Sequence, residues 1–389
     1  MTRRSPAFRT PAAERLPAFP WDTLAEATQR AAAHPDGMIN LSVGTPVDDV
    51  PPNVQLALTE AAWQPGYPPT EGSAELREAI VAAMARRFGV TGLSEDAVVP
   101  VIGTKEAIAS LPMDLGIHAG SLVVIPELAY PTYEVSAKLA GCRVLRADSL
   151  LKLGPETPAL IYLNSPANPH GAVLGVEHLR KVVDFARQRD CIVVSDECYL
   201  GLGWEATEVA DAPVSILDPR VCDGDHRNLI AVHSLSKTSN MASYRAGWLA
   251  GDQELMAEIL GIRKHAGGMV PGPIQRAMIA ALSSDDFETL QRQRYRERRE
   301  VLLAGLAAGG FTVEHSEAGL YIWATEGRDA WETVDRFAEL GILVAPGHFY
   351  GPAGAQHVRV GLTASDEQIA QAAQRLAALG EGAVGEGAV

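Results

Sequence analysis

The segment LIAVHSLSKTSNMASYRAGW, residues 229–248, carries the clearest indication of fold class in this chain. It begins with a continuous apolar run at 229–233 and then changes within a few residues to hydroxyl, amide and charged side chains. A continuous apolar run predicts a strand that is buried on both faces of a sheet, because a half-exposed strand would alternate. Similar runs lie upstream, at 98–102, 122–125, 159–163 and 191–195.

Helical patterns separate these apolar runs. They begin near residues 104, 131 and 176, so that strands and helices alternate through the middle of the chain. Alternation of this kind predicts an α/β fold with a mostly parallel central sheet.

The character of the sequence changes after about residue 285. A charged helical stretch at 292–299 precedes shorter apolar runs near 321–323, 342–344 and 357–362. We therefore expect a smaller α/β domain beside the large one, with the N-terminal residues packed against it. The expected division is a large domain at 45–285, a small domain made of 1–44 and 286–380, and a flexible tail at 381–389.

The composition excludes several classes of function. The 389 residues include 33 Lys and Arg against 48 Asp and Glu, a net charge of −15, and no basic stripe suited to nucleic acid. No apolar run approaches the roughly 18 residues of a membrane span, and the N-terminus lacks the apolar core of a secretory signal. The four cysteines form no CxxC pair and no His cluster has metal-ligand spacing. We expect free thiols, no metal and a reducing cytoplasm.

Polar residues gather at the predicted carboxyl ends of the strands. In parallel α/β sheets, ligands bind just beyond these ends. The chain places Gly, Pro, hydroxyl and charged residues there in separate segments, which predicts one composite site. The segments are 103–104, 130–131, 164–171, 196–199 and 234–237.

Lys237 is the strongest candidate for a reactive group. A lysine that is partly desolvated or close to other cations has a lowered pKa and is able to attack a carbonyl carbon. Ser234, Ser236 and Arg245 lie close to it in sequence and predict a cradle for phosphate, because a guanidinium presents a fork of donors. The alternative for Lys237 is a solvated loop residue.

Three further segments offer groups that suit a cofactor. Asp196 closes an apolar strand, where a carboxylate needs a partner; the protonated ring nitrogen of pyridoxal phosphate would supply one, and a helix N-cap or an ion pair is the alternative. Asn168 precedes a proline that holds its backbone extended; its amide is a candidate donor to a phenolate oxygen of the cofactor, and the alternative is an ordinary turn. Gly103 and Thr104 stand where a strand ends and a helix begins, a place that binds phosphate or is simply capped.

The order and spacing of these segments resemble the class I and II aminotransferases of pyridoxal-phosphate fold type I. The resemblance covers roughly residues 17–379. Within the family, the chain looks closest to the actinobacterial succinyldiaminopimelate aminotransferases. The stretches that carry this finer similarity are 40–48, 101–108, 196–204 and 344–351.

The resemblance implies a role for each residue of the site. Lys237, Asp196 and Tyr199 form the catalytic set, with Lys237 as the Schiff-base lysine that also moves the substrate α-proton. Asp196 pairs with the pyridinium, Asn168 and Tyr199 donate to the cofactor 3′-oxygen, and Tyr130 stacks on the ring. The phosphate cup consists of Gly103, Thr104, Lys105 (through its backbone), Ser234, Ser236 and Arg245.

The resemblance also implies the substrates and the assembly. Arg359 clamps the substrate α-carboxylate, and the loop at Gly44 closes over it. Tyr67 reaches the cofactor phosphate of a neighbouring subunit, and 264–271 approaches that subunit's site, so the enzyme is a homodimer with a shared active site. The reaction moves an amino group between L-glutamate and N-succinyl-2-amino-6-oxopimelate, in lysine biosynthesis.

Two features depart from the family pattern. His170 stands where the family usually has threonine, so it alters substrate choice or fills loop space, and 264–268 is unusually small and rich in glycine.

Several alternative functions use the same cofactor or a similar fold. The same cofactor also serves C–S lyases, decarboxylases, acyl-condensing enzymes and secondary-metabolite aminotransferases. A sensor half of a transcription regulator would need a DNA-binding module, and the residues before Asn40 are too few and too rich in Pro and Ala. A nicotinamide dinucleotide enzyme would need a strand-linked GxGxxG, which the sequence lacks.

Overall fold

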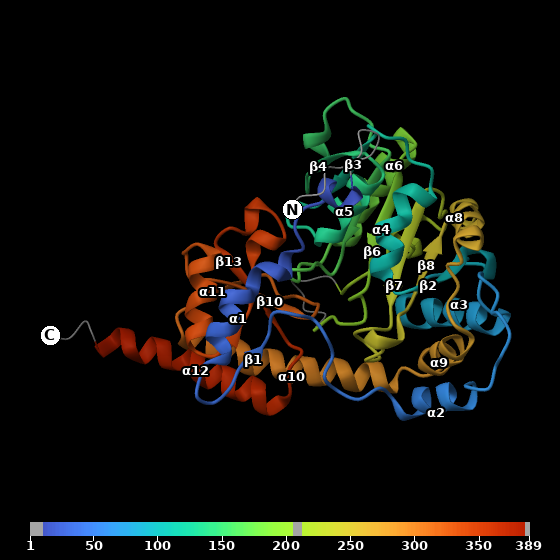
Figure 1. Cartoon of the computed structure of the whole chain (residues 1–389). Coiled ribbons are helices and arrows are strands. Elements are labelled where there is room, and N and C mark those ends of the chain that lie inside the picture. Colours follow the sequence, from blue (N-terminus) through green and yellow to red (C-terminus); the bar gives the residue numbers. More distant parts are fainter. Residues whose placement is uncertain (1–10, 205–211, 386–389) are drawn as a thin grey trace.

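The computed structural model describes residues 11–204 and 212–385, and its main feature is a seven-stranded sheet (Figure 1). The strand order is β2-β8-β7-β6-β5-β3-β4. The strands from β3 to β7 pair in parallel, and β8 runs antiparallel between β2 and β7. Their bounds are β2 Val98–Ile102, β3 Leu122–Ile125, β4 Arg143–Arg146, β5 Leu160–Asn164, β6 Ile192–Asp196, β7 Leu229–Ser234 and β8 Ala246–Gly251.

This sheet confirms the predicted α/β fold with a mostly parallel central sheet. The five apolar runs of the sequence form β2, β3, β5, β6 and β7. Two strands were not predicted, for reasons of composition. The edge strand β4 has an arginine at each end, and β8 consists largely of alanine and glycine, so neither shows a long apolar run.

The side chains of the central strands alternate between two hydrophobic cores. Along β7, Leu229 and Ala231 belong to one core, and Ile230 and Val232 belong to the other. Because successive side chains of a strand point to opposite faces, helices must cover both sides of the sheet. The first core contains α3 Ala74–Phe88, α6 Val176–Arg189 and α9 Gly272–Leu282, and the second contains α4 Thr104–Asp114, α5 Pro131–Leu139 and α8 Gln253–Ala266.

Helix ends show why the sheet-covering helices start and stop where they do. The side chain of Ser73 accepts a hydrogen bond from the backbone nitrogen of Leu76 and caps α3. The same helix ends at Gly89, whose φ of 68° is a left-handed conformation that suits glycine. The remaining helices near the sheet are α2 Pro52–Glu60 and α7 Pro219–Cys222.

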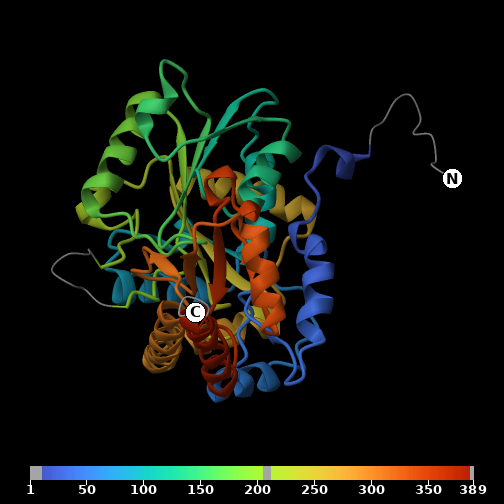
Figure 2. The ribbon, with the colours of Figure 1, turned by 90° about the vertical axis from the view of Figure 1, so that its left-hand side faces the viewer.

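A second sheet, antiparallel and four-stranded, lies beside the first and has its own core. Its order is β12-β13-β10-β9. N-terminal residues, including Leu24 and Ile39, pack in this core, and Figure 2 shows the N-terminal helix beside the C-terminal part of the chain. The strands are β9 Thr312–Glu314, β10 Tyr321–Thr325, β12 Ala345–Pro346 and β13 His357–Gly361, with β1 Ile39–Asn40 paired to β11 Ile342–Leu343. The helices are α1 Ala25–Ala32, α10 Asp286–Ala308, α11 Ala330–Glu339 and α12 Asp366–Gly385.

The predicted division into a large and a small domain stays a prediction. Helix α12 continues past residue 380, where the sequence predicted the small domain to end and a flexible tail to begin. Residues 386–389 of that predicted tail lie outside the described residues.

The structure also describes the cysteines, the side chains of metal-ligating types and the apolar character of the helices. Cys142, Cys191, Cys198 and Cys222 are free thiols. Within the described ranges, no cluster of His, Cys, Asp and Glu side chains has the arrangement of a metal site. None of the helices in the same residues combines the length and the apolar character that crossing a bilayer requires.

Candidate active site

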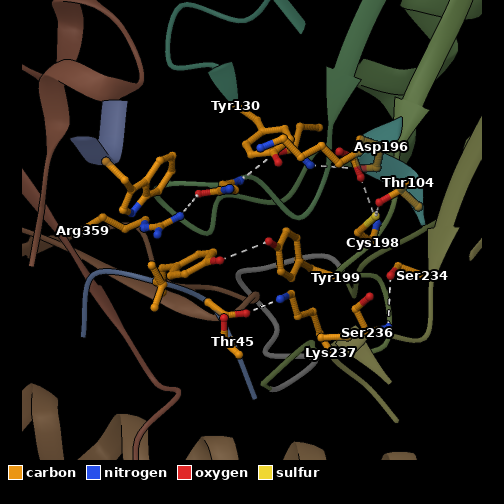
Figure 3. Close-up of a pocket in the computed structure, with 18 of the residues that line it drawn as sticks. Thr45, Thr104, Tyr130, Asp196, Cys198, Tyr199, Ser234, Ser236, Lys237 and Arg359 are labelled. Carbon is orange, nitrogen blue, oxygen red and sulfur yellow. Dashed lines mark hydrogen bonds between the residues drawn. The ribbon is translucent and has the colours of Figure 1, made fainter. Parts of the chain in front are cut away.

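Most of the predicted site residues line one cavity of about 460 Å³ at the carboxyl ends of β5, β6 and β7 (Figure 3). The cavity lies between the two sheets, since Arg359 of β13 reaches it from the smaller sheet. The sequence-predicted residues in its wall are Gly44, Thr104, Lys105, Tyr130, Asn168, Asp196, Tyr199, Ser234, Ser236, Lys237, Arg245 and Arg359.

Lys237 lies in the turn that follows β7, with its amino group directed into the cavity. Its Nζ donates a hydrogen bond to the backbone carbonyl of Gly44. Burial lowers the pKa of Lys237, and the charges of Arg359 and Arg245 lower it further. Among the described residues no carboxylate forms an ion pair with it. A lysine with a lowered pKa and no ionic partner is able to act as a nucleophile and as a proton carrier.

Asp196 is a buried carboxylate at the end of β6. Tyr133 donates its hydroxyl proton to Oδ2 over 2.7 Å, and the backbone nitrogen of Cys198 donates to Oδ1 over 3.2 Å. Burial raises the pKa of Asp196, and no cation of the described part of the chain forms an ion pair with it. The site therefore fits a ligand that brings a positive charge to this carboxylate, as the protonated ring nitrogen of pyridoxal phosphate does.

The opposite requirement, a place for an anion, is met where β2 leads into α4. Gly103 has a φ of 75°, and a Cβ at this position would overlap the guanidinium of Arg245. Burial lowers the pKa of Lys105, and the charge of Arg245 adds to this effect. The backbone nitrogen of Ser236 donates to the Ser234 hydroxyl over 3.1 Å. The Arg245 guanidinium, two serines and a helix N-terminus at one point fit a phosphate group.

Arg359 is buried in β13 and meets only neutral oxygens. Its guanidinium donates to Asn168 Oδ1 over 2.9 Å and to the Ser42 carbonyl over 2.6 Å. The Nε of Arg359 is buried and has no hydrogen-bond partner among the described residues. The backbone nitrogen of Asn168 donates to Asn164 Oδ1 over 2.7 Å, which fixes the loop. A buried cation without a carboxylate partner fits the binding of a substrate carboxylate.

Two predicted tyrosines complete the wall. Tyr130 precedes α5, and burial raises its pKa to about 12. The hydroxyl of Tyr199 lies 3.3 Å from the hydroxyl of Tyr321 on β10. Burial also raises the pKa of Tyr199, well above its ordinary value. Both phenols are therefore protonated near neutral pH and able to donate.

Four parts of the prediction lie outside the cavity. Gly103 does not line the cavity but packs directly against Arg245. Tyr67 is 95% exposed in the segment between α2 and α3. The glycines at 267–268 follow α8, near the pair formed by Arg263 and Glu106. His170 faces a different cavity of about 270 Å³, where its ring centroid lies 5.0 Å from that of His315.

The cavity wall also contains residues that the sequence did not single out. Asn164 is level with Asp196 in the register of β5 and β6, so the strand-end argument was sufficient to find it. Tyr133, one helical turn after Tyr130, reaches Asp196 from outside the wall, and no motif marks it. The sequence predicted no role for the others, which are Phe19, Trp21, Val43, Thr45, Cys198, Ala242 and Tyr321.

Comparison with known proteins defines the class of this protein. Residues 36–376 match the family described as aminotransferase class I and II, so the chain belongs to that family. The family and its fold depend on pyridoxal phosphate, and the chain is accordingly a pyridoxal-phosphate-dependent aminotransferase.

Individual relatives cover nearly the whole chain. It is 62% identical to a probable aminotransferase of Mycobacterium tuberculosis, over 93% of this chain and 85% of that one. It is 54% identical to the 4-dedimethylamino-4-oxo-anhydrotetracycline transaminase of Streptomyces rimosus, over 93% and 99%. It is 33% identical to the LL-diaminopimelate aminotransferase of Gloeobacter violaceus, over 94% and 97%. Among solved structures, an aminotransferase from Staphylococcus aureus matches with a TM-score of 0.86 and 26% identity, covering 96% of this chain and 99% of that chain.

Proposed function

We propose that this aminotransferase moves an amino group between L-glutamate and an oxo acid with a second carboxylate, N-succinyl-2-amino-6-oxopimelate. The observation that carries the proposal is the cavity itself. It combines a lysine of lowered pKa, a buried carboxylate without an ion-pair partner, Arg245 at the proposed phosphate site and Arg359 at the proposed carboxylate site. The expected cellular location is the cytoplasm.

Each side chain has a part in the proposed reaction. When bound, pyridoxal phosphate supplies an electron-withdrawing ring that stabilises negative charge at the substrate α-carbon. Asp196 holds the ring nitrogen in its protonated form, and Lys237 holds the cofactor and carries the α-proton on its Nζ. Asn168 and Tyr199 donate to the 3′-oxygen. The amide oxygen of Asn168 already accepts from Arg359, which leaves its amide nitrogen as a donor.

The remaining cavity residues bind and orient. Tyr130 stacks on the cofactor ring, which limits the ring to one plane. The phosphate is held by the hydroxyls, the backbone at the start of α4 and the guanidinium. These groups are Thr104, Lys105, Ser234, Ser236 and Arg245 together with Gly103, whose lack of a side chain makes room for the guanidinium.

Arg359 binds the substrate α-carboxylate, and the backbone of Gly44 closes over it. A second cation supports a substrate with a second carboxylate. The ammonium of Lys105 lies 5.2 Å from the ring centroid of Phe19 at the cavity wall, without an acidic partner among the described residues. Glutamate and the succinylated oxo acid both carry a distal carboxylate, so one cation would serve both half-reactions.

The proposed enzyme is a homodimer in which Tyr67 completes the phosphate site of the other subunit. The 95% exposure of the Tyr67 side chain supports a partner, as does the 77% exposure of Trp63 in the same segment. Two inactive variants, Lys237→Ala and Tyr67→Ala, should regain activity when unfolded together and refolded as a mixture. One of the two sites in the mixed dimer then contains both residues. Failure of the mixture to exceed the separate variants would exclude a shared site.

The substrate is tested by single-turnover reactions. Glutamate should convert the visible absorbance of the bound cofactor to that of its aminated form. A panel of oxo acids should then reverse this change, and the succinylated oxopimelate should react fastest. Lys237→Ala should lose turnover and still bind the cofactor. A protein whose absorbance stays that of the lysine-bound cofactor when glutamate is added would instead fit a lyase or decarboxylase of the same fold.

One relative favours a second candidate function. The Streptomyces rimosus transaminase is named for an oxo-anhydrotetracycline, and this chain is 54% identical to it over 99% of its length. The aromatic side chains Phe19, Trp21 and Tyr321 in the cavity wall are also compatible with a flat polycyclic ketone. The oxo-acid panel should therefore include such a ketone, and faster reaction with it than with the succinylated oxo acid would replace our proposal.

A further inference from the structure

Tyr321 lies in the wall of the cavity, although no motif marks it. It begins β10, which pairs antiparallel with β13 so that Trp323 lies opposite Arg359 and Tyr321 opposite Gly361. Tyr321 and Arg359 are therefore diagonal neighbours on one face of the smaller sheet. The side chain of Tyr321 is 5% exposed and lines the same cavity as Lys237.

Three contacts fix the position of this side chain. The guanidinium carbon of Arg359 lies 3.8 Å from the centroid of the Tyr321 ring, stacked on its face. The Tyr321 hydroxyl lies 3.3 Å from that of Tyr199, and Figure 3 shows the dashed line that leaves the labelled Tyr199. A Cβ at Gly44 would overlap the same hydroxyl, so the Gly44 backbone packs against it. One side chain thus touches the carboxylate clamp, the closing loop and a proposed donor to the cofactor.

The charges around the two phenols differ, and this difference favours donation by Tyr321. Burial raises the pKa of Tyr321, but the positive charges of Arg359 and Lys237 outweigh burial and lower it. Burial raises the pKa of Tyr199. Either hydroxyl of this pair can donate to the other; when Tyr321 donates, the proton of Tyr199 is left for a ligand. The other groups that act electrostatically with Tyr321 are Tyr130 before α5, Tyr295 of α10 and Tyr350.

We propose that Tyr321 is a positioning residue that connects the two halves of the site, its ring holding the Arg359 guanidinium and its hydroxyl holding that of Tyr199. The proposal rests on the proposed roles of Arg359 and Tyr199. Binding of a substrate carboxylate at Arg359 then acts through a single side chain on Tyr199, one of the two proposed donors to the cofactor 3′-oxygen. A buried aromatic ring that only filled space would not connect Arg359 to Tyr199 in this way.

The test compares Tyr321→Phe with Tyr350→Phe. Tyr350 is a matched control, because its buried ring also lies near Arg359, at 5.2 Å, and its hydroxyl has no hydrogen-bond partner in the described residues. The main readout is the pH midpoint at which the absorbance of the lysine-bound cofactor changes. Losing one hydrogen bond should raise this midpoint by roughly 0.5–1 unit in Tyr321→Phe, because a weaker Tyr199 donor stabilises the deprotonated form less.

Kinetics provide a second readout. For Tyr321→Phe we expect kcat with glutamate to fall about fivefold to tenfold, with KM within about twofold, since the ring still supports Arg359. Tyr321→Leu removes the ring as well and should raise KM about tenfold or more. Tyr350→Phe should leave all three quantities unchanged. Equal midpoints and equal kcat for Tyr321→Phe and Tyr350→Phe would overturn the proposal.

A double-variant cycle separates direct from general effects. In a Tyr199→Phe background, adding Tyr321→Phe should shift the midpoint no further, because the connection is already broken. An additional shift as large as in the wild type would also overturn the proposal. These measurements use only the cofactor and glutamate, so they remain decisive if the enzyme proves inactive with the succinylated oxo acid.

Discussion

Tyr133→Phe is expected to weaken cofactor binding although Tyr133 does not line the cavity. The hydroxyl donates to Asp196 Oδ2 over 2.7 Å, and the other donors to this carboxylate among the described residues both belong to Cys198: its backbone nitrogen and its thiol. Burial raises the pKa of Asp196 and so disfavours its charged form. The hydrogen bond from Tyr133 favours the charged carboxylate, which is the form that would pair with the protonated ring nitrogen of the cofactor.

The magnitude follows from the type of bond that is lost. A hydrogen bond to a charged group contributes about 1.5–3 kcal/mol, which corresponds to roughly 10- to 100-fold in a dissociation constant. We therefore expect the dissociation constant of pyridoxal phosphate to rise by this factor in Tyr133→Phe, measured by equilibrium dialysis of the protein freed of cofactor.

The control for this experiment is Tyr162→Phe. Tyr162 is equally buried and stacks on Tyr133 at 4.9 Å, but its hydroxyl pairs with Ser136 over 3.0 Å and does not contact Asp196. It should lose some stability and little cofactor affinity. If Tyr133→Phe bound pyridoxal phosphate as tightly as Tyr162→Phe, Asp196 would not depend on this donor and our account of its charge would be refuted.

Two further predictions concern single positions. Gly44→Ala should lower kcat/KM for glutamate roughly 5- to 100-fold while cofactor binding persists, because the new Cβ would overlap the Tyr321 hydroxyl and overpacking costs about 1–3 kcal/mol. The control is Gly261→Ala, where a new Cβ has no neighbour within contact distance. Equal kcat/KM values for the two variants would contradict the packing of Gly44 against Tyr321. Burial lowers the pKa of His170 to about 4, so the stability that its neutral form confers is complete above pH 6.5 and is lost as the pH falls from about 6.5 to 4. Urea unfolding at pH 7.5 and 4.5 should therefore show a loss about 2–3 kcal/mol smaller in His170→Thr than in the wild type, and identical losses would argue against a buried neutral imidazole.

The polar residues at the ends of the strands could be predicted because they follow apolar runs that are visible in the local sequence. Apolar runs predicted five strands of the central sheet, among them β5, β6 and β7, and parallel strands present their carboxyl ends at one edge. Residues directly after those strands, such as Asp196 and Lys237, therefore had to lie close together. The prediction of a single cavity needed no knowledge of side-chain contacts.

Residues that reach the cavity from other parts of the chain could not be predicted in this way, because they do not follow the central strands. Trp21 and Tyr321 come from the N-terminal segment and the smaller sheet, and each is an ordinary aromatic residue in its own segment. His170 shows the reverse case. Its sequence neighbour Asn168 lines the cavity, yet the loop turns the imidazole toward His315 in the other cavity, so proximity in sequence was a poor guide to proximity in space.

The amino-acid sequence by itself determined the alternation of strands and helices, the burial of the central strands and the identity of the groups at their ends, because each depends on hydrophobic periodicity over a few residues. Only the tertiary structure decided that Tyr133 supports Asp196 and that Tyr321 lies between Arg359 and Tyr199. Those contacts join residues far apart in the chain, and they depend on strand register and on how the smaller sheet packs against the larger one. No local pattern of residues encodes that placement.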